Sequence, residues 1–153
     1  MEKFEKYPSR KNPRLSGFDY STQNYYFITI CTHGKECIFG KPDMRNTYGE
    51  YAYEGLVQIP KHYPDVRVEK FVVMPNHVHA VLFLRGTGSN IERVVGSYKS
   101  YVSKKVHNHE PDRKVWQDSF HDHVIRNEES YQKIWLYIEE NPRNWQKDCF
   151  CIE

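Results

Sequence analysis

The chain has 153 residues, 39% hydrophobic and 27% charged, a balance typical of one soluble globular domain rather than of a disordered chain. Its 22 basic and 20 acidic side chains leave a net charge of +2, so overall charge favours no particular partner. No apolar run approaches the roughly 20 residues of a membrane span, and the polar N-terminus does not resemble a signal peptide. We therefore expect a cytoplasmic protein with reduced thiols. Its four cysteines lack the paired spacing of a zinc site: Cys31, Cys37, Cys149 and Cys151.

The chain begins with a basic segment, 1–19, in which two prolines and a glycine disfavour regular structure. A β-branched and aromatic run predicts a strand at 25–32, and after a turn we expect a short return strand at 36–39. Apolar side chains at roughly helical intervals predict a helix at 47–62. We expect Pro60 to end or kink that helix.

The middle of the chain predicts a hairpin followed by a long helix. Residues 66–74 alternate and then become continuously apolar, and residues 77–84 are apolar after a Pro-Asn turn. These segments predict two antiparallel strands. Asn90 can cap a helix over 91–107, which has one apolar face and several lysines elsewhere.

The last expected elements are a strand at 120–125 and a helix at 128–140, followed by a short tail at 143–153. The resulting order is β, α, β-hairpin, α, β, α. This order suits an α+β fold of the ferredoxin-like, split βαβ type, with an antiparallel sheet and helices packed on one face. We expect one domain over 1–153.

Two histidines, His77 and His79, lie on the strand predicted at 77–84. Because side chains alternate across a sheet, the two imidazoles share a face, and such a pair can bind a metal. The alternative is two surface histidines without a ligand. His121 and His123 form a second pair of this kind, for which a structural role or DNA contact is favoured over a second metal site.

Tyr137 lies on the flank of the apolar stripe of the last helix, with Asn141 one turn further on the same side. Such a tyrosine can keep its ring packed while its hydroxyl reaches a cleft, although a boundary tyrosine without chemistry is the alternative. A metal held by two histidines can polarise a phosphodiester, and a tyrosine hydroxyl can attack the phosphorus to give a phosphotyrosine. Because the phosphoester is kept, this chemistry suits strand transfer better than hydrolysis.

Several motifs carry a resemblance to a known family. Residues 74–79 (MPNHVH) resemble the HUH motif of the single-tyrosine transposases, and residues 137–142 (YIEENP) resemble the YI-x-x-NP signature of their REP-associated branch. Three further stretches resemble that branch: 10–20, 26–32 and 116–126 (WQDSFHDHVIR). The motifs occur in the same order as in the family and span nearly the whole chain.

The resemblance implies a ferredoxin-like fold that cuts and joins single-stranded DNA near hairpins. It implies Mg²⁺ or Mn²⁺, a 5′-phosphotyrosine intermediate and a free 3′-OH. By analogy, His77 and His79 are metal ligands and Tyr137 is the nucleophile. Insertion-sequence relatives carry a glutamine ligand at the position of Asn141, so Asn141 or the adjacent Glu140 is the expected third ligand. Two imidazoles suit Mn²⁺ better than Mg²⁺, and both metals stay open.

The resemblance also leaves the oligomeric state open. Insertion-sequence relatives work as dimers with shared sites, whereas the REP-associated branch resembles a monomer with its tyrosine in cis. A homodimer is therefore an alternative to a single chain that supplies its own tyrosine.

We expect DNA contacts from basic side chains of the N-terminal segment and of the helix at 91–107. The candidates are Arg10, Lys11, Arg14, Lys99, Lys104 and Lys105. Two other functions compete with strand transfer. A non-enzymatic module that binds single-stranded nucleic acid would display aromatic side chains on its open sheet face, and a metal-dependent hydrolase that uses water would not need Tyr137.

Overall fold

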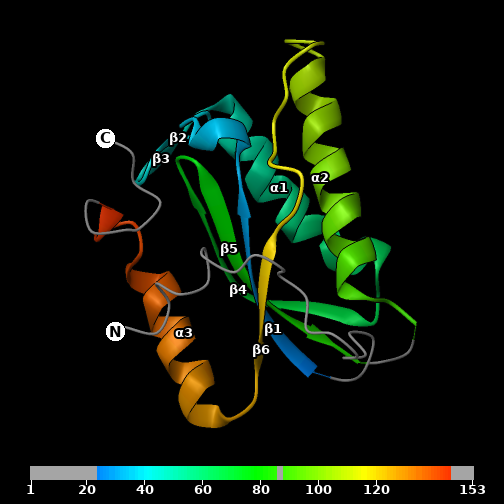
Figure 1. Cartoon of the computed structure of the whole chain (residues 1–153), viewed down its shortest axis with the longest axis vertical. Coiled ribbons are helices and arrows are strands. Elements are labelled where there is room, and N and C mark those ends of the chain that lie inside the picture. The colour runs from blue at the N-terminus through cyan, green and yellow to red at the C-terminus, as the bar shows by residue number, and fades with distance from the viewer. Residues whose placement is uncertain (1–23, 86–87, 146–153) are drawn as a thin grey trace.

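The computed structural model describes residues 24–85 and 88–145, and its centre is a four-stranded antiparallel sheet (Figure 1). In the order across the sheet, the strands are β4 Val66–Met74, β5 His77–Leu84, β1 Asn24–Cys31 and β6 His121–Ile125. The smaller elements between β1 and the first helix are the 3₁₀ turn η2 His33–Lys35 and the hairpin strands β2 Gly40–Lys41 and β3 Met44–Arg45. The predicted α+β fold with an antiparallel sheet is confirmed.

Three helices pack on the sheet, and each begins after a capping asparagine. They are α1 Thr47–His62, α2 Ile91–His107 and α3 Glu128–Glu140. The side chains of Asn46, Asn90 and Asn127 each accept a hydrogen bond from the backbone N–H three residues later, which satisfies one of the unpaired donors at a helix start. Among the described residues, none of these helices combines the length and the apolar character needed to cross a membrane.

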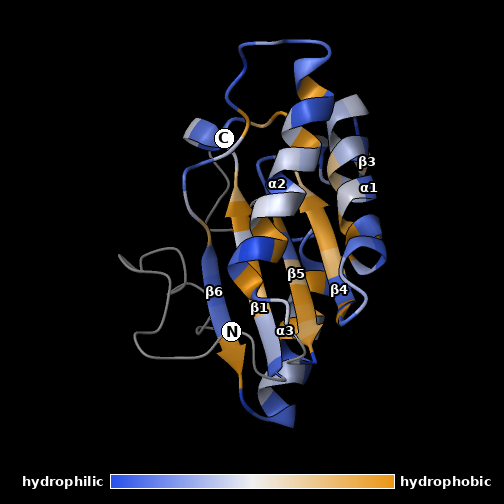
Figure 2. Ribbon diagram, turned by 90° about the vertical axis from the view of Figure 1, so that its right-hand side faces the viewer, coloured by the Kyte–Doolittle hydropathy of each residue, from blue (hydrophilic) through white to orange (hydrophobic). Residues whose placement is uncertain are grey.

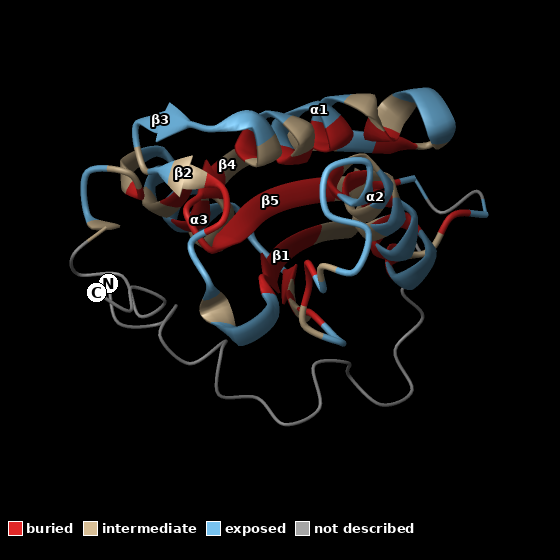
Figure 3. Ribbon diagram, turned by 90° about the horizontal axis from the view of Figure 1, so that it is seen from above, coloured by how far each residue is buried: buried red, intermediate tan, exposed pale blue. Residues whose placement is uncertain are grey.

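The helices lie on both faces of the sheet. α1 and α2 pack over one face and α3 over the other (Figures 1 and 2), whereas we expected all helices on one face. The physical reason lies in β1, where Tyr26 and Ile28 face α1 and α2 while Phe27 faces α3. A strand that is apolar on both faces needs cover on both. Accordingly, β5 and β1 are buried along most of their length (Figure 3).

One local expectation was wrong. Residues 36–39 form no return strand, because the backbone N–H of Phe39 donates to the carbonyl of Pro75 at 3.0 Å and the β2–β3 hairpin only follows afterwards. Of the two effects expected of Pro60, it does not end α1, which continues to His62, since a proline in the last turn removes only one helical hydrogen bond. The other expected helices and strands agree with the structure to within one residue at each end.

The contact between α1 and α2 depends on Gly55. A Cβ at this position would lie 2.8 Å from Cε1 of Tyr98, and the Tyr98 ring cannot easily move because its hydroxyl donates to the carbonyl of Ala52 at 2.9 Å. We expect Gly55→Ala to lower the free energy of unfolding by about 1–3 kcal/mol, as overpacked cores do. Urea denaturation measures this loss.

Gly96 supplies the matched control for that measurement. It lies in α2, where a Cβ would meet no atom within 4 Å, so Gly96→Ala is expected to be neutral or to stabilise the fold by up to about 1 kcal/mol. Equal destabilisation by the two substitutions would contradict the packing argument.

Candidate functional site

A buried pair of histidines lies on the sheet face that α3 covers. His77 and His79 are 0% and 1% exposed, and their ring centroids are 4.6 Å apart. Val78 between them points into the core under α1 and α2. The alternation expected of the strand therefore holds, and the two imidazoles meet on one face.

A neighbouring oxygen engages Nδ1 of each imidazole. Oγ1 of Thr29, on the adjacent strand β1, lies 3.0 Å from Nδ1 of His79. Oδ1 of Asn76 lies 2.8 Å from Nδ1 of His77. Because an amide oxygen can only accept, Nδ1 of His77 carries the proton, and Nε2 keeps the lone pair that a metal would use.

Burial also determines the charge of the two rings. Burial lowers the pKa of His77 well below its ordinary value, and the neighbouring His79 lowers it further. The side chain of Asn141 raises this pKa, but by less than burial lowers it. Burial lowers the pKa of His79 to about 3. Both imidazoles are thus neutral at pH 7, which is the state that binds metal.

Tyr137 and Asn141 of α3 approach this pair within the same chain. The half-buried Tyr137 ring lies edge-on to His79, with 5.4 Å between centroids, and at 90° to Phe27. Asn141 is 2% exposed, and its Nδ2 donates to the carbonyl of Tyr137 at 3.5 Å. The ring of Trp145 stacks on His77 with 6.2 Å between centroids. The residues predicted as metal ligands and nucleophile are therefore brought together by β5 and the C-terminal end of α3.

The residues present fit a divalent cation. Oδ1 of Asn141 is buried and has no hydrogen-bond partner among the described residues, as expected of an oxygen that coordinates a metal ion. With the two imidazoles it would give a neutral donor set of two nitrogens and one oxygen, and a cation held there would act as a Lewis acid. Within residues 24–85 and 88–145, no cluster of three or more His, Cys, Asp or Glu side chains offers another metal site.

The second histidine pair borders the same site. His121 and His123 lie on β6 directly across from Thr29 and Phe27 of β1, so alternation places them on the face that carries His77 and His79. Both are partly exposed. A DNA contact by this pair stays a prediction.

Three of the six residues predicted to contact DNA lie among the described residues. Lys99, Lys104 and Lys105 belong to α2, which covers the sheet face opposite the histidines. Nζ of Lys99 donates to the carbonyl of Gln117 at 2.7 Å, which is a structural use of this side chain. The other three candidates lie outside the described residues: Arg10, Lys11 and Arg14.

Reasoning from the sequence missed the side chains that support the histidines. Thr29 is the polar residue of the apolar run 25–31, which is a signal that could have singled it out. Asn76 was assigned to a turn only, although it also bonds the His77 ring. Trp145 carried no pattern that links it to the site.

The burial of His79 predicts a pH dependence of stability. Because the pKa of His79 falls from 6.5 to about 3 on folding, below pH 6.5 the unfolded chain binds a proton that the folded chain does not. Folding is therefore weakened as the pH falls from 6.5 toward 3, by roughly 2 kcal/mol between pH 6.5 and 5. Urea denaturation of the protein in EDTA measures the slope.

His79→Leu removes this titrating group and is the control. We expect its unfolding free energy to change less between pH 6.5 and 5 than that of the wild type. Parallel pH profiles for the two proteins would contradict the assignment of the slope to His79.

The sequence is also similar to those of known proteins. Residues 20–141 match the family described as "Transposase IS200 like". An uncharacterised protein of Haemophilus influenzae is 32% identical over 169 residues, which cover 94% of each chain.

Two solved structures are similar in fold. The first, a REP-associated tyrosine transposase bound to a REP hairpin, has a TM-score of 0.69 at 18% identity and covers 86% of this chain and 74% of its own. The second, a candidate transposase from Deinococcus radiodurans R1, has a TM-score of 0.56 at 17% identity and covers 83% of this chain and 95% of its own. The match over residues 20–141 includes both histidines of the pair, Tyr137 and Asn141, and the chain belongs to the IS200-like transposase family.

Proposed function

We propose that this transposase is a metal-dependent endonuclease and strand transferase that acts on single-stranded DNA near hairpins through a covalent 5′-phosphotyrosine. The observation that carries the proposal is that the ring centroids of Tyr137 and His79 lie 5.4 Å apart within one chain. Tyr137 is partly exposed while His79 is buried. The phenol can therefore meet a phosphate that enters from solvent and rests against the histidines.

His77, His79 and Asn141 would hold Mg²⁺ or Mn²⁺, and the bound cation would polarise a phosphate oxygen of the DNA. The Tyr137 hydroxyl loses its proton to solvent, and its oxygen attacks the phosphorus. The bond from phosphorus to the 3′-oxygen breaks, and that oxygen takes up a proton to leave as a free 3′-OH. The phosphate stays on Tyr137, so a second 3′-OH can reverse the reaction and join a new strand without an energy source.

The hairpin in this proposal is supported by the fold shared with a transposase that is described as bound to a REP hairpin. A second copy of the chain is not required, because Tyr137 and the histidines meet within one chain. A non-enzymatic nucleic-acid module is less well supported. Such a module needs exposed aromatic side chains on the sheet, and here α3 covers the face that carries buried histidines.

The test uses the full chain with a 5′- or 3′-labelled single-stranded hairpin and Mn²⁺ or Mg²⁺, analysed on a denaturing gel. We expect a protein–DNA adduct with the DNA on the 3′ side of the break, and mass spectrometry should map it to Tyr137. Cleavage without an adduct would replace the proposal by hydrolysis with water. Binding without cleavage would replace it by a binding module.

A further inference from the structure

A strained lysine lies beside the histidine pair. Lys35, at the end of η2, has a φ of 55° and is the one residue other than glycine with a positive φ among the described residues. Glycine or asparagine would hold this left-handed backbone at a lower cost than lysine. Such strain is typical of functional positions, and here it suggests a use for the lysine side chain.

Hydrogen bonds connect this turn to the histidine motif. The carbonyl of Lys35 accepts from Nδ2 of Asn76 at 3.1 Å, and Oδ1 of the same amide accepts from Nδ1 of His77 at 2.8 Å. The backbone N–H of Lys35 donates to the carbonyl of Thr32 at 3.0 Å, and the backbone N–H of Thr32 donates to the carbonyl of Asn76 at 3.0 Å. The position of Lys35 is therefore fixed relative to His77 by one side chain between them.

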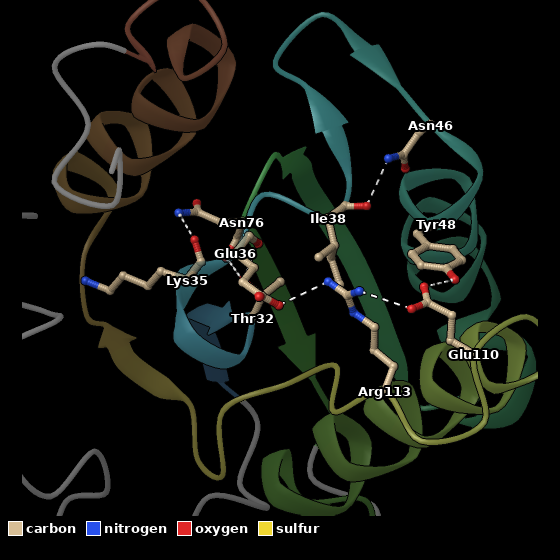
Figure 4. Close-up of polar contacts among 9 residues, drawn as sticks. All are labelled: Thr32, Lys35, Glu36, Ile38, Asn46, Tyr48, Asn76, Glu110 and Arg113. Carbon is tan, nitrogen blue, oxygen red and sulfur yellow. Dashed lines mark hydrogen bonds and ion pairs between the residues drawn. The ribbon is translucent and has the colours of Figure 1, made fainter. Parts of the chain in front are cut away.

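The Lys35 side chain extends away from the neighbouring ion pair. Glu36 pairs with Arg113 at 3.0 Å, and Figure 4 shows Lys35 leaving the turn on the side away from these two residues. If His77, His79 and Asn141 bind a metal ion, that ion and the Lys35 ammonium repel each other unless an anion lies between them.

We propose that the Lys35 ammonium contacts a non-bridging oxygen of the phosphate that Tyr137 attacks, and so acts as a catalytic residue. This inference rests on the proposed function. The bond pattern of the reaction does not change, because Lys35 keeps its proton and neutralises charge that builds up on the phosphoryl oxygens. A charge-assisted hydrogen bond of this kind acts more strongly in the transition state than in the bound DNA.

The experiment compares Lys35→Asn, Lys35→Arg and the wild type in single-turnover adduct formation at saturating hairpin DNA with Mn²⁺. Asparagine tolerates the left-handed backbone but removes the charge, so it isolates the side chain. We expect the rate constant to fall at least about 10-fold in Lys35→Asn and to stay within about 3-fold of wild type in Lys35→Arg. Hairpin affinity should change by less than about 3-fold in both. Lys61→Asn, an exposed residue of α1, is the control for the loss of one positive charge.

The outcomes separate the two claims. If the wild-type protein forms the adduct and Lys35→Asn forms it at the same rate, the role of Lys35 is overturned and the proposed function stays intact. The same holds if Lys35→Asn weakens hairpin binding as much as it slows the reaction and Lys35→Arg restores neither. Absence of an adduct with the wild type would overturn the proposed function, and the role of Lys35 with it.

Discussion

Replacing Tyr137 by phenylalanine is expected to abolish the covalent adduct, with at least about a 1,000-fold loss of DNA cleavage and strand transfer. The substitution removes only the attacking oxygen. The phenylalanine ring can keep the edge contacts that Tyr137 makes with His79 and Phe27, so stability should change by less than about 0.5 kcal/mol. Single-turnover cleavage of labelled hairpin DNA measures the loss.

The same substitution at Tyr131, which precedes Tyr137 in α3, is the control. The Tyr131 ring also packs against the apolar cluster between α3 and the sheet, but its hydroxyl donates to Glu69 at 3.0 Å. Burial and this carboxylate raise the pKa of Tyr131 to about 12, which makes it a poor nucleophile. Tyr131→Phe should keep cleavage and lose at most about 1 kcal/mol of stability. An adduct that survives in Tyr137→Phe would contradict the assignment of the nucleophile.

Most of the fold follows from local patterns in the sequence. The three helices begin after Asn46, Asn90 and Asn127, each of which caps its helix in the structure, and capping is a local interaction that sequence reveals. The pairing of His77 with His79 follows from the period of two in a strand. The placement of α3 on the second sheet face was not predicted, because it depends on which strands lie in the centre of the sheet.

The support of the site depends on contacts between distant segments. Thr29 reaches His79 only because β1 pairs with β5 in one particular register, and no local pattern in either strand specifies that register. Asn76 and Lys35 meet across a separation of 41 residues. The left-handed backbone of Lys35 is likewise set by its tertiary contacts, since lysine has no preference for it.

Replacing His77 and His79 together by alanine is expected to lower cleavage by at least about 100-fold while hairpin affinity stays within about 3-fold of the wild type. The first expectation follows from the loss of two of the three proposed metal ligands, and the second from the dominance of phosphate contacts in DNA affinity. Single-turnover cleavage at saturating DNA and fluorescence anisotropy in EDTA measure the two quantities separately. Titration with Mn²⁺, followed by electron paramagnetic resonance, should show that the double variant has lost its tight metal binding.

Val78→Ala supplies the control for the cavity that such substitutions leave. Val78 lies between the two histidines in the sequence, but its side chain is buried in the core under α1 and α2. Its truncation therefore lowers stability without removing a proposed metal ligand. At a temperature where both variants are folded, Val78→Ala should retain metal binding and cleavage. If the histidine variant and Val78→Ala lose cleavage equally, or if the histidine variant loses hairpin binding as fully as cleavage, the histidines serve the fold or the DNA rather than a metal. If the histidine variant instead keeps its affinity for hairpin DNA but loses metal binding, the residues that bind DNA are different from the residues that bind the metal. DNA recognition and catalysis would then belong to different parts of the chain.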